Sequence, residues 1–347
     1  MHHRYSIVRS RPAVIFGSDG REGAEAAMRQ LMELFVAQAQ RGNCSFLHIE
    51  RNGPEVTLLA GGHGHRLDLL PTDDPELLKD LLSEQALPRN NPNKASVFYP
   101  QDVDASMLLP ISYVSRLFSL TTVRNGVKSF FRVLDGKEAD GLPTEMVKEE
   151  DCTEIRIILD PAVFRETELS AEFYLEALER YALLSPGLSC SYTEQNTEST
   201  VFHYPEGIHA YHKGLPSYRY QLATRGKDSI KRPDYDASVE VSIAPAAGHS
   251  RLLLFHNMRR MRCDGVYKTA LETMYRSFRA LDPAVRRSDL EGQFSIVIAT
   301  WCTQKHSRWV NGERRAITNP LIEALLQEAV GKSFLRFLET NREAFLP

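Results

Sequence analysis

The sequence predicts an α+β protein, and three observations carry that prediction. Residues 22–40 repeat apolar side chains at helical spacing, with Met28, Leu31 and Leu34 on one face. Asn125-Gly126 joins two apolar runs, and this dipeptide is the strongest short hairpin signal in the chain. Strands, hairpins and helices then mix along the chain without an internal repeat, which is typical of an α+β layer.

The elements of the first half follow from periodicity and from turn residues. Glycine follows the first helix at Gly42, and Asn52-Gly53 marks a turn between two apolar runs. In order, we expect a helix over 22–40, a hairpin of strands 45–50 and 56–60, a glycine-rich loop over 61–64, a short helix over 77–82, a loop over 88–100, a buried helix over 107–120, hairpin strands 120–124 and 128–134, a strand over 155–159 and a helix over 172–184.

The second half changes character near residue 205. Residues 225–236 are charged and poor in apolar side chains, which favours a loop. Beyond them we expect strands over 239–243 and 252–255, a helix over 267–281, a strand over 294–300 and a helix over 319–338. This order predicts a second, smaller α/β domain, and we expect the two domains to occupy residues 1–215 and 216–347.

Composition excludes several classes of protein. With 347 residues and 42% hydrophobic side chains the chain can build a sizeable core, so wholesale disorder is excluded. The net charge of −3 is not that of a generic polycation, so nucleic-acid binding would need a local basic patch. Five scattered cysteines without a CxxC pair argue against a disulfide framework and a zinc site. No apolar run is long enough to cross a membrane, so we expect a cytoplasmic protein without membrane partners.

Several short motifs occur in one order along the chain. The run Val8 to Gly17 reads VRSRPAVIFG, and Arg41 to Cys44 reads RGNC at the end of the first helix. Further along come Gly62-His63-Gly64, Arg124-Asn125-Gly126, Cys152-Thr153-Glu154-Ile155 and Phe202-His203-Tyr204-Pro205-Glu206-Gly207-Ile208. Together these resemble VRKRPGMYIG, AGHCD, DNGRGIP, R-x-G, GT-x-V and FHYEGGI in the B subunits of type IIA DNA topoisomerases, that is, gyrase B and the topoisomerase IV B subunit.

The resemblance continues through the second half. His256-Asn257-Met258 is similar to NNI, and residues 292–300 are similar to the strand GLTAVISVKV. The resemblance implies a GHKL-type ATPase domain of the Bergerat fold over 1–215 and a ribosomal-S5-like transducer domain over 216–347. No counterpart of the family's DNA-cleaving domain is expected up to Pro347.

The resemblance also implies where the nucleotide machinery should lie. The helix glutamate that acts as general base corresponds to Gln30, and the magnesium-binding asparagine corresponds to Leu34. Neither residue can perform the role of its counterpart, because the Gln30 amide is a poor proton acceptor and Leu34 offers no oxygen to a hard cation. Glu33 lies three residues away and would need a local register shift to replace the base. The adenine-binding aspartate corresponds to Ala60, which makes no hydrogen bond, while Thr153 keeps a supporting hydroxyl.

The phosphate-binding parts depart from the family as well. Gly62 and Gly64 keep a tight backbone turn, either as part of the old pocket or simply as a turn after a strand. The family's glycine-rich lid corresponds to 88–118, which contains no glycine, and backbone amides there would be crowded by side chains. The transducer lysine corresponds to the region of Lys305 and Arg308, which would offer a phosphate-binding cation or a solvated charge.

These departures predict a degenerate, gyrase-B-like pseudo-ATPase that acts by protein interaction, as a regulator or mimic of a topoisomerase or with an unrelated partner. We expect no cofactor, and a protein partner that is a second copy or a topoisomerase subunit. One alternative is a repurposed enzyme that binds ATP with magnesium, or another ligand, in the vestigial pocket of Gln30, Leu34, Ala60, Gly62, Gly64 and Thr153. The other is a DNA-binding accessory protein that uses Arg259, Arg260 and Arg262. The pair His209 and His212 has the i, i+3 spacing of two metal ligands but lacks a third at defined spacing.

Overall fold

The computed structural model describes residues 8–40, 42–62, 108–135, 137–138, 144–195, 197–214, 224–232, 235–246, 251–263, 265–281, 283–284, 286, 294–302 and 319–340. Among these, the residues up to Pro205 form one compact unit and those from Glu206 onward form a second. The two units are called unit 1 and unit 2. The domain boundary expected at 215/216 stays a prediction.

Unit 1 is built on a nine-stranded sheet. Its strand order is β5-β4-β3-β7-β2-β1-β8-β9, with β6 paired to β4, and every pairing is antiparallel except that of β1 with β8. The strands are β1 (Cys44–Asn52), β2 (Glu55–Gly62), β3 (Ser115–Arg124), β4 (Val127–Leu134), β5 (Lys137–Glu138), β6 (Thr144–Met146), β7 (Cys152–Leu159), β8 (Ser189–Glu194) and β9 (Thr200–His203).

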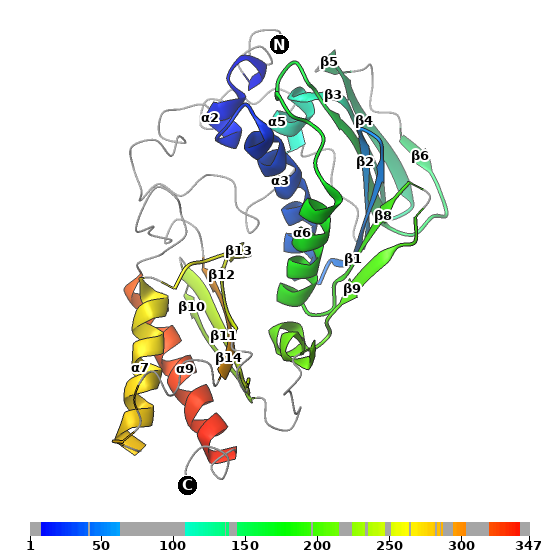
Figure 1. Ribbon diagram of the computed structural model, residues 1–347. Coiled ribbons are helices and arrows are strands. Elements are labelled where there is room, and N and C mark those ends of the chain that lie inside the picture. The colour runs from blue at the N-terminus through cyan, green and yellow to red at the C-terminus, as the bar shows by residue number, and fades with distance from the viewer. Residues whose placement is uncertain are drawn as a thin grey trace. The chain divides into compact units, whose positions relative to one another are not determined.

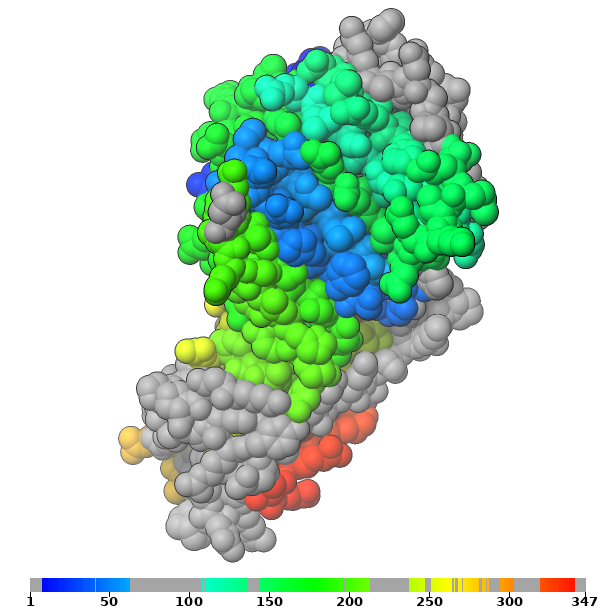
Figure 2. Space-filling view, turned by 90° about the vertical axis from the view of Figure 1, so that its right-hand side faces the viewer, coloured from blue at the N-terminus to red at the C-terminus, as the bar shows by residue number. Residues whose placement is uncertain are grey.

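Helices cover one face of this sheet (Figure 1). They are α2 (Pro12–Phe16), α3 (Arg21–Gln40), α5 (Leu108–Tyr113) and α6 (Ala171–Leu184). Alternate strand residues such as Leu58, Leu120 and Ile155 are fully buried on the helix side, as the period of two requires. Figure 2 looks onto the opposite face, where the blue surface of β1 and β2 lies between the neighbouring strands.

The structure confirms most of the expected elements of unit 1 and corrects two of them. The expected hairpin turn is present, with positive φ at Asn125 (52°) and Gly126 (74°), as a two-residue turn between right-twisted strands demands. The single helix expected over 107–120 is wrong, because α5 ends at Tyr113 and β3 begins at Ser115. The loop expected to begin at residue 61 is also wrong at its start, because Gly61 and Gly62 are the last residues of β2.

Unit 2 is a five-stranded sheet of order β10-β11-β14-β12-β13 with two long helices on one face (Figure 1). The strands are β10 (Thr224–Arg232), β11 (Tyr235–Pro245), β12 (Leu252–His256), β13 (Arg259–Arg260) and β14 (Phe294–Cys302), and the helices are α7 (Val266–Leu281) and α9 (Pro320–Thr340). Their shared core includes Val241, Met274, Ile298 and Phe334. The 3-10 helix η3 (Gly207–Gly214) packs on β11 and β14.

The loop expected over 225–236 is wrong. Residues 224–232 form β10, which pairs in antiparallel register with β11 from Thr224 opposite Ile243 to Arg232 opposite Tyr235. β10 lies at the edge of its sheet, and edge strands tolerate charged residues that a central strand would exclude. Within the described residues, no helix is long and apolar enough to cross a membrane.

An ion pair connects the segment that precedes α2 with the residue that follows β7. The Arg9 guanidinium pairs with the Asp160 carboxylate, which follows β7, and also donates to the carbonyl of Tyr113 at 3.1 Å. Asp160 in turn accepts the amide of Ala162 at 2.8 Å, and its side chain is 9% exposed. The Arg9 side chain therefore joins the N-terminal segment, the end of α5 and the end of β7.

We expect Asp160→Asn to lower the free energy of unfolding by about 3 kcal/mol, because it leaves a largely buried guanidinium without its carboxylate. The measurement is urea unfolding followed by far-ultraviolet circular dichroism. Arg165→Met is the matched control: it removes an ion pair with Asp19 whose side chains are 78% and 49% exposed, and it should cost less than about 1 kcal/mol. Equal losses in the two variants would contradict the assignment.

Two buried histidines of unit 2 are held neutral. The ring of His256 is fully buried, with Nδ1 2.9 Å from the Thr300 hydroxyl and Nε2 3.9 Å from the Cys302 sulfur. Burial, with a smaller effect of Arg259, lowers the pKa of His256 to about 3. Burial also lowers the pKa of His212 to about 4, with a further lowering by His209.

We expect unit 2 to lose stability as the pH falls below about 6.5. In the unfolded chain both histidines bind a proton near that pH, whereas in the folded protein they stay neutral until about pH 3 to 4. The loss is up to about 1.4 kcal/mol per pH unit for each histidine. Tryptophan fluorescence in urea at pH 7.0, 6.0 and 5.0 measures it, since both tryptophans, Trp301 and Trp309, belong to this half of the chain. His256→Leu should reduce the slope and the exposed His203→Gln should not; an unchanged slope in His256→Leu would refute the linkage.

Candidate functional site

Three small side chains form a row on the helix-covered face of the unit 1 sheet. Ala60 of β2 lies opposite Thr153 of β7, and Thr153 lies opposite Thr122 of β3. All three are buried, at 4%, 3% and 2% exposure, and the two hydroxyl oxygens are 3.5 Å apart. The row therefore offers a methyl group and two hydroxyls, and no carboxylate. Thr122 was not foreseen; its signal was the alternation of β3, which places it on the same face as Leu120.

The helix positions expected to carry the base and the metal ligand lie one turn apart on α3. Leu34 is buried, with 1% of its surface exposed, and is part of the apolar packing of the helix. The side-chain oxygen of Gln30 is shielded from solvent and has no hydrogen-bond partner among the residues that the structure describes. An amide there can accept or donate a hydrogen bond, but it supplies neither a proton acceptor near neutral pH nor an anionic metal ligand.

Glu33, the nearest carboxylate on α3, contacts α6. It is 7% exposed and accepts a hydrogen bond from the Tyr181 hydroxyl of α6 at 3.4 Å. Burial, together with the negative charge of Glu33, raises the pKa of Tyr181, so the hydroxyl stays a donor. Glu33 is thus part of the packing between α3 and α6.

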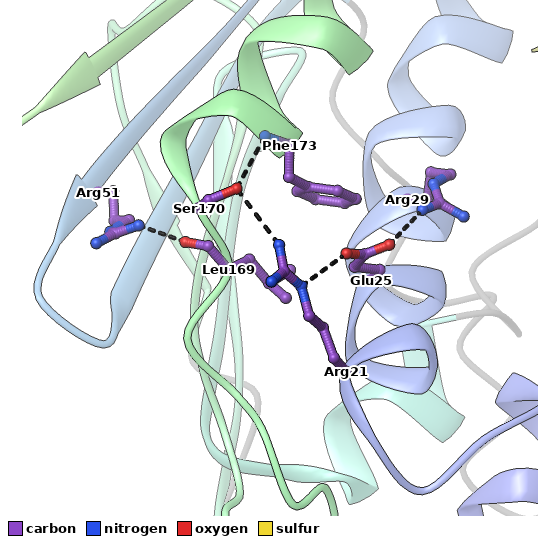
Figure 3. Close-up of polar contacts among 7 residues, drawn as sticks. All are labelled: Arg21, Glu25, Arg29, Arg51, Leu169, Ser170 and Phe173. Atoms are coloured by element: carbon purple, nitrogen blue, oxygen red, sulfur yellow. Dashed lines mark hydrogen bonds and ion pairs between the residues drawn. The ribbon is translucent and has the colours of Figure 1, made fainter.

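Further polar contacts connect α6 with α3 and the segment before α6 with β1 (Figure 3). Glu25 bridges Arg21 and Arg29 along α3 at 3.1 and 2.9 Å, and the Arg29 guanidinium lies 5.4 Å from the ring centre of Phe173. Ser170 caps the N-terminus of α6 by accepting the amide of Phe173 at 3.4 Å. Arg51 of β1 donates to the carbonyl of Leu169. The contact of Arg29 with Phe173 therefore joins α3 to α6, and that of Arg51 with Leu169 joins β1 to the segment before α6.

Gly62 ends β2 in a conformation that demands glycine. Its φ is +127°, and a Cβ there would lie 1.9 Å from the carbonyl oxygen of Asn43. Its amide donates to the carbonyl of Asp151 at 3.1 Å. The close backbone approach explains this glycine without a ligand, which favours the interpretation as a structural turn. Gly64 and the segment 88–107 lie outside the described residues.

The basic run 259–262 forms the end of a tight hairpin in unit 2. Asn257 and Met258 turn the chain with positive φ values of 44° and 68°, and β13 pairs Arg260 with Phe255 and Arg259 with His256. Arg260 and Arg262 are exposed, whereas Met261 between them is buried in the core. The structure therefore brings the expected DNA-contact residues to one hairpin. Lys305 and Arg308 lie outside the described residues.

The histidine pair of η3 does not make a metal centre with its described neighbours. The rings of His209 and His212 meet edge to face with centres 6.4 Å apart, and His209 Nδ1 lies 3.2 Å from the Ser242 hydroxyl. Across the part of the chain that the structure describes, no group of three histidine, cysteine or acidic side chains is placed to hold a metal ion.

The fold is that of the ATPase and transducer fragment of gyrase B, with a GHKL domain followed by an S5-like domain. The B subunit of the DNA gyrase from Myxococcus xanthus matches with a TM-score of 0.75 and 17% identity, over 99% of this chain and 98% of that one. The 43K ATPase domain of Thermus thermophilus gyrase B, solved with an aminocoumarin, matches with a TM-score of 0.73 and 19% identity, over 98% and 91%.

Sequence comparison leads to the same fold family. The chain is 21% identical to the B subunit of DNA gyrase from Thermotoga maritima over 97% of its length and 55% of that protein. It is 22% identical to the B subunit of DNA topoisomerase 4 from Enterococcus faecalis over 67% and 36%. No family model matches it. The chain is a distant homologue of the ATPase-plus-transducer region of these proteins and spans about half the length of the curated gyrase relatives it matches, or less for topoisomerase 4.

We expect Gly62→Ala to lower the free energy of unfolding by at least about 2 kcal/mol, because the added methyl group meets a backbone oxygen and the φ angle is strained. Gly20→Ala is the control, since a Cβ there makes only an ordinary contact, 3.5 Å from the Ser18 hydroxyl. Chemical unfolding without nucleotide is the measurement. A fully stable Gly62→Ala would contradict the structural role and would favour a role in ligand binding.

Proposed function

We propose that this chain is a gyrase-B-like scaffold that does not turn over ATP and acts through protein contacts. The observation that carries the proposal is the set of side chains at the three positions that the resemblance assigns to nucleotide chemistry: Gln30, Leu34 and Ala60. The general base, the metal ligand and the adenine acceptor are each replaced by a residue that cannot do the same work.

The size of the expected defect follows from what each group contributes. A positioned general base is worth about 10²- to 10⁴-fold in rate, and a lost electrostatic contact in the transition state costs about 10²- to 10³-fold. Glu33 does not compensate, because its carboxylate is buried against Tyr181. Hydrolysis should therefore fall below any physiologically useful rate.

Recognition of adenine should be weakened for a separate reason. The exocyclic amine of adenine needs an acceptor, and Ala60 has none, while its described neighbours in the row, Thr122 and Thr153, are hydroxyls that an amine does not select strongly. The partner that the scaffold would engage is a topoisomerase subunit, a second copy of the chain or an unrelated protein.

A repurposed binding pocket is the second candidate function. It is favoured by the shielded side-chain oxygen of Gln30, which has no hydrogen-bond partner in the described part of the chain, and by the two hydroxyls of the row. Buried polar atoms are nearly always paired, so such an oxygen is suited to a ligand that donates a hydrogen bond. This candidate predicts saturable binding of a small molecule that Gln30→Leu weakens.

A DNA-binding accessory role is the third candidate, supported by the exposed Arg260 and Arg262 of the β13 hairpin. Contacts to phosphates make affinity fall steeply with salt. Duplex DNA binding that is absent, or insensitive to salt, would remove this candidate.

We expect no change in melting temperature beyond about 1 °C with millimolar Mg-ATP, and no phosphate release above the blank. A ligand present at 100 times its dissociation constant stabilises a protein by about 2.7 kcal/mol, which would raise the melting temperature by several degrees. A gyrase B ATPase fragment serves as the positive control. A shift of that size, abolished by Thr153→Val, would overturn the loss of nucleotide binding, and phosphate release that Gln30→Ala abolishes would overturn the loss of turnover.

A further inference from the structure

The two halves of the chain carry opposite charges that the total conceals. Residues 1–205 hold 20 Lys and Arg against 30 Asp and Glu, a net charge of −10. Residues 206–347 hold 22 Lys and Arg against 15 Asp and Glu, a net charge of +7. The two halves therefore differ strongly in net charge, although the whole chain has a net charge of only −3.

A row of acidic side chains lies on the outer side of α6 in unit 1. Glu172, Glu176 and Glu179 recur at i, i+4 and i+7, so they share one face of the helix, and Glu168 precedes it. All four are exposed. Glu179 accepts a hydrogen bond from Tyr204 at 3.2 Å, but none of the four forms an ion pair within the described residues. We call this surface the α6 acidic face.

Three basic side chains lie on the outer side of α7 in unit 2. Lys268, Arg276 and Arg279 are exposed on the side opposite the core residues Met274 and Phe278. None of the three forms an ion pair with the described residues, although Glu272 lies on the same stripe. We call this surface the α7 basic face.

We propose that two copies of this chain associate through these surfaces, the α6 acidic face of one copy against the α7 basic face of the other. The charged stripes have comparable lengths: about 10 Å from Glu172 to Glu179 and about 16 Å from Lys268 to Arg279, at 1.5 Å per helical residue. Two helices of opposite charge can align along such stripes. The contact needs neither nucleotide nor the candidate site. It deepens the proposed function by naming a second copy as the partner, and it can be tested without any measurement of ATP binding or turnover.

Charge complementarity selects a second copy over a nucleic acid as the occupant. A polyanion would match the α7 basic face but would leave the α6 acidic face without a partner. A second copy offers a partner for both faces, because its basic face pairs with the acidic face of the first copy and its acidic face with the basic face. Exposed ion pairs are individually weak, so the association is salt-sensitive and its specificity comes from the matched pattern of charge.

The test begins with sedimentation velocity of the full chain at several concentrations, in about 50 mM and about 500 mM salt. The distance over which charges act falls from about 10 Å at 0.1 M salt to about 3 Å at 1 M. We expect concentration-dependent association at low salt that weakens at least about tenfold at high salt. A chain that stays monomeric at low salt, or that compacts independently of concentration, would overturn the proposal.

Charge reversal then locates the contact. We expect Glu172→Lys/Glu176→Lys and, separately, Arg276→Glu/Arg279→Glu to abolish self-association, with Glu172→Gln/Glu176→Gln intermediate. An equimolar mixture of the two reversed variants should associate again, because the new lysines meet the new glutamates. Glu50→Lys/Glu198→Lys is the matched control: it makes the same change in net charge at exposed positions away from α6 and should weaken association far less than the α6 reversal.

The equimolar mixture of the two charge-reversed variants is the decisive measurement. Circular dichroism and urea unfolding first establish that each reversed variant is folded. Folded variants that fail to associate in the mixture, or a control pair that disrupts association as strongly as the α6 pair, would show that the two faces do not meet. Association that duplex DNA displaces without any effect of the α6 reversal would assign the α7 basic face to nucleic acid instead.

Discussion

The antiparallel register of β2 on β7 decides what the candidate site contains. It places Leu58 opposite Ile155 and Ala60 opposite Thr153 on the face that the helices cover. A slip of one residue would turn this whole set toward the other face of the sheet, so burial specifies the register strongly. Gly62 secures the end of the pairing, because only glycine allows β2 to approach the backbone of Asn43 so closely. With the register fixed, the side chain at residue 60 alone decides whether the sheet offers an acceptor there.

Most of the fold was predictable, and the errors have physical causes. The helices α3, α6, α7 and α9 are marked by apolar periodicity and by end signals such as Asn319, whose side chain caps α9. The run 107–120 was misread because a short continuous apolar stretch fits a buried helix and a buried strand equally well. β10 was missed because an edge strand needs no apolar alternation. The pairing of β8 with β1 was beyond prediction, since parallel neighbours are joined by contacts distant in sequence.

The candidate site was predictable only through its resemblance to a family. No propensity or spacing within this sequence marks Gln30, Leu34 or Ala60, since a glutamine, a leucine and an alanine are ordinary residues in a helix or a strand. The orientation of Glu33 could not be foreseen, because its partner Tyr181 lies 148 positions away in the chain. The pairing of Thr122 with Thr153 likewise needs the order of the strands. The sequence gives the residue types at such a site, but it does not give the orientation of the helix that carries them.

The small net charge of the whole chain does not describe the charge of its parts, because the two halves have net charges of opposite sign. The net charge of −3 excludes a generic polycation only for the whole chain, because it averages over a half at −10 and a half at +7. Interactions act over about 10 Å at 0.1 M salt, which is shorter than a domain, so an approaching molecule experiences one unit at a time. The faces of α6 and α7, rather than the total, therefore govern what approaches this protein and in which orientation.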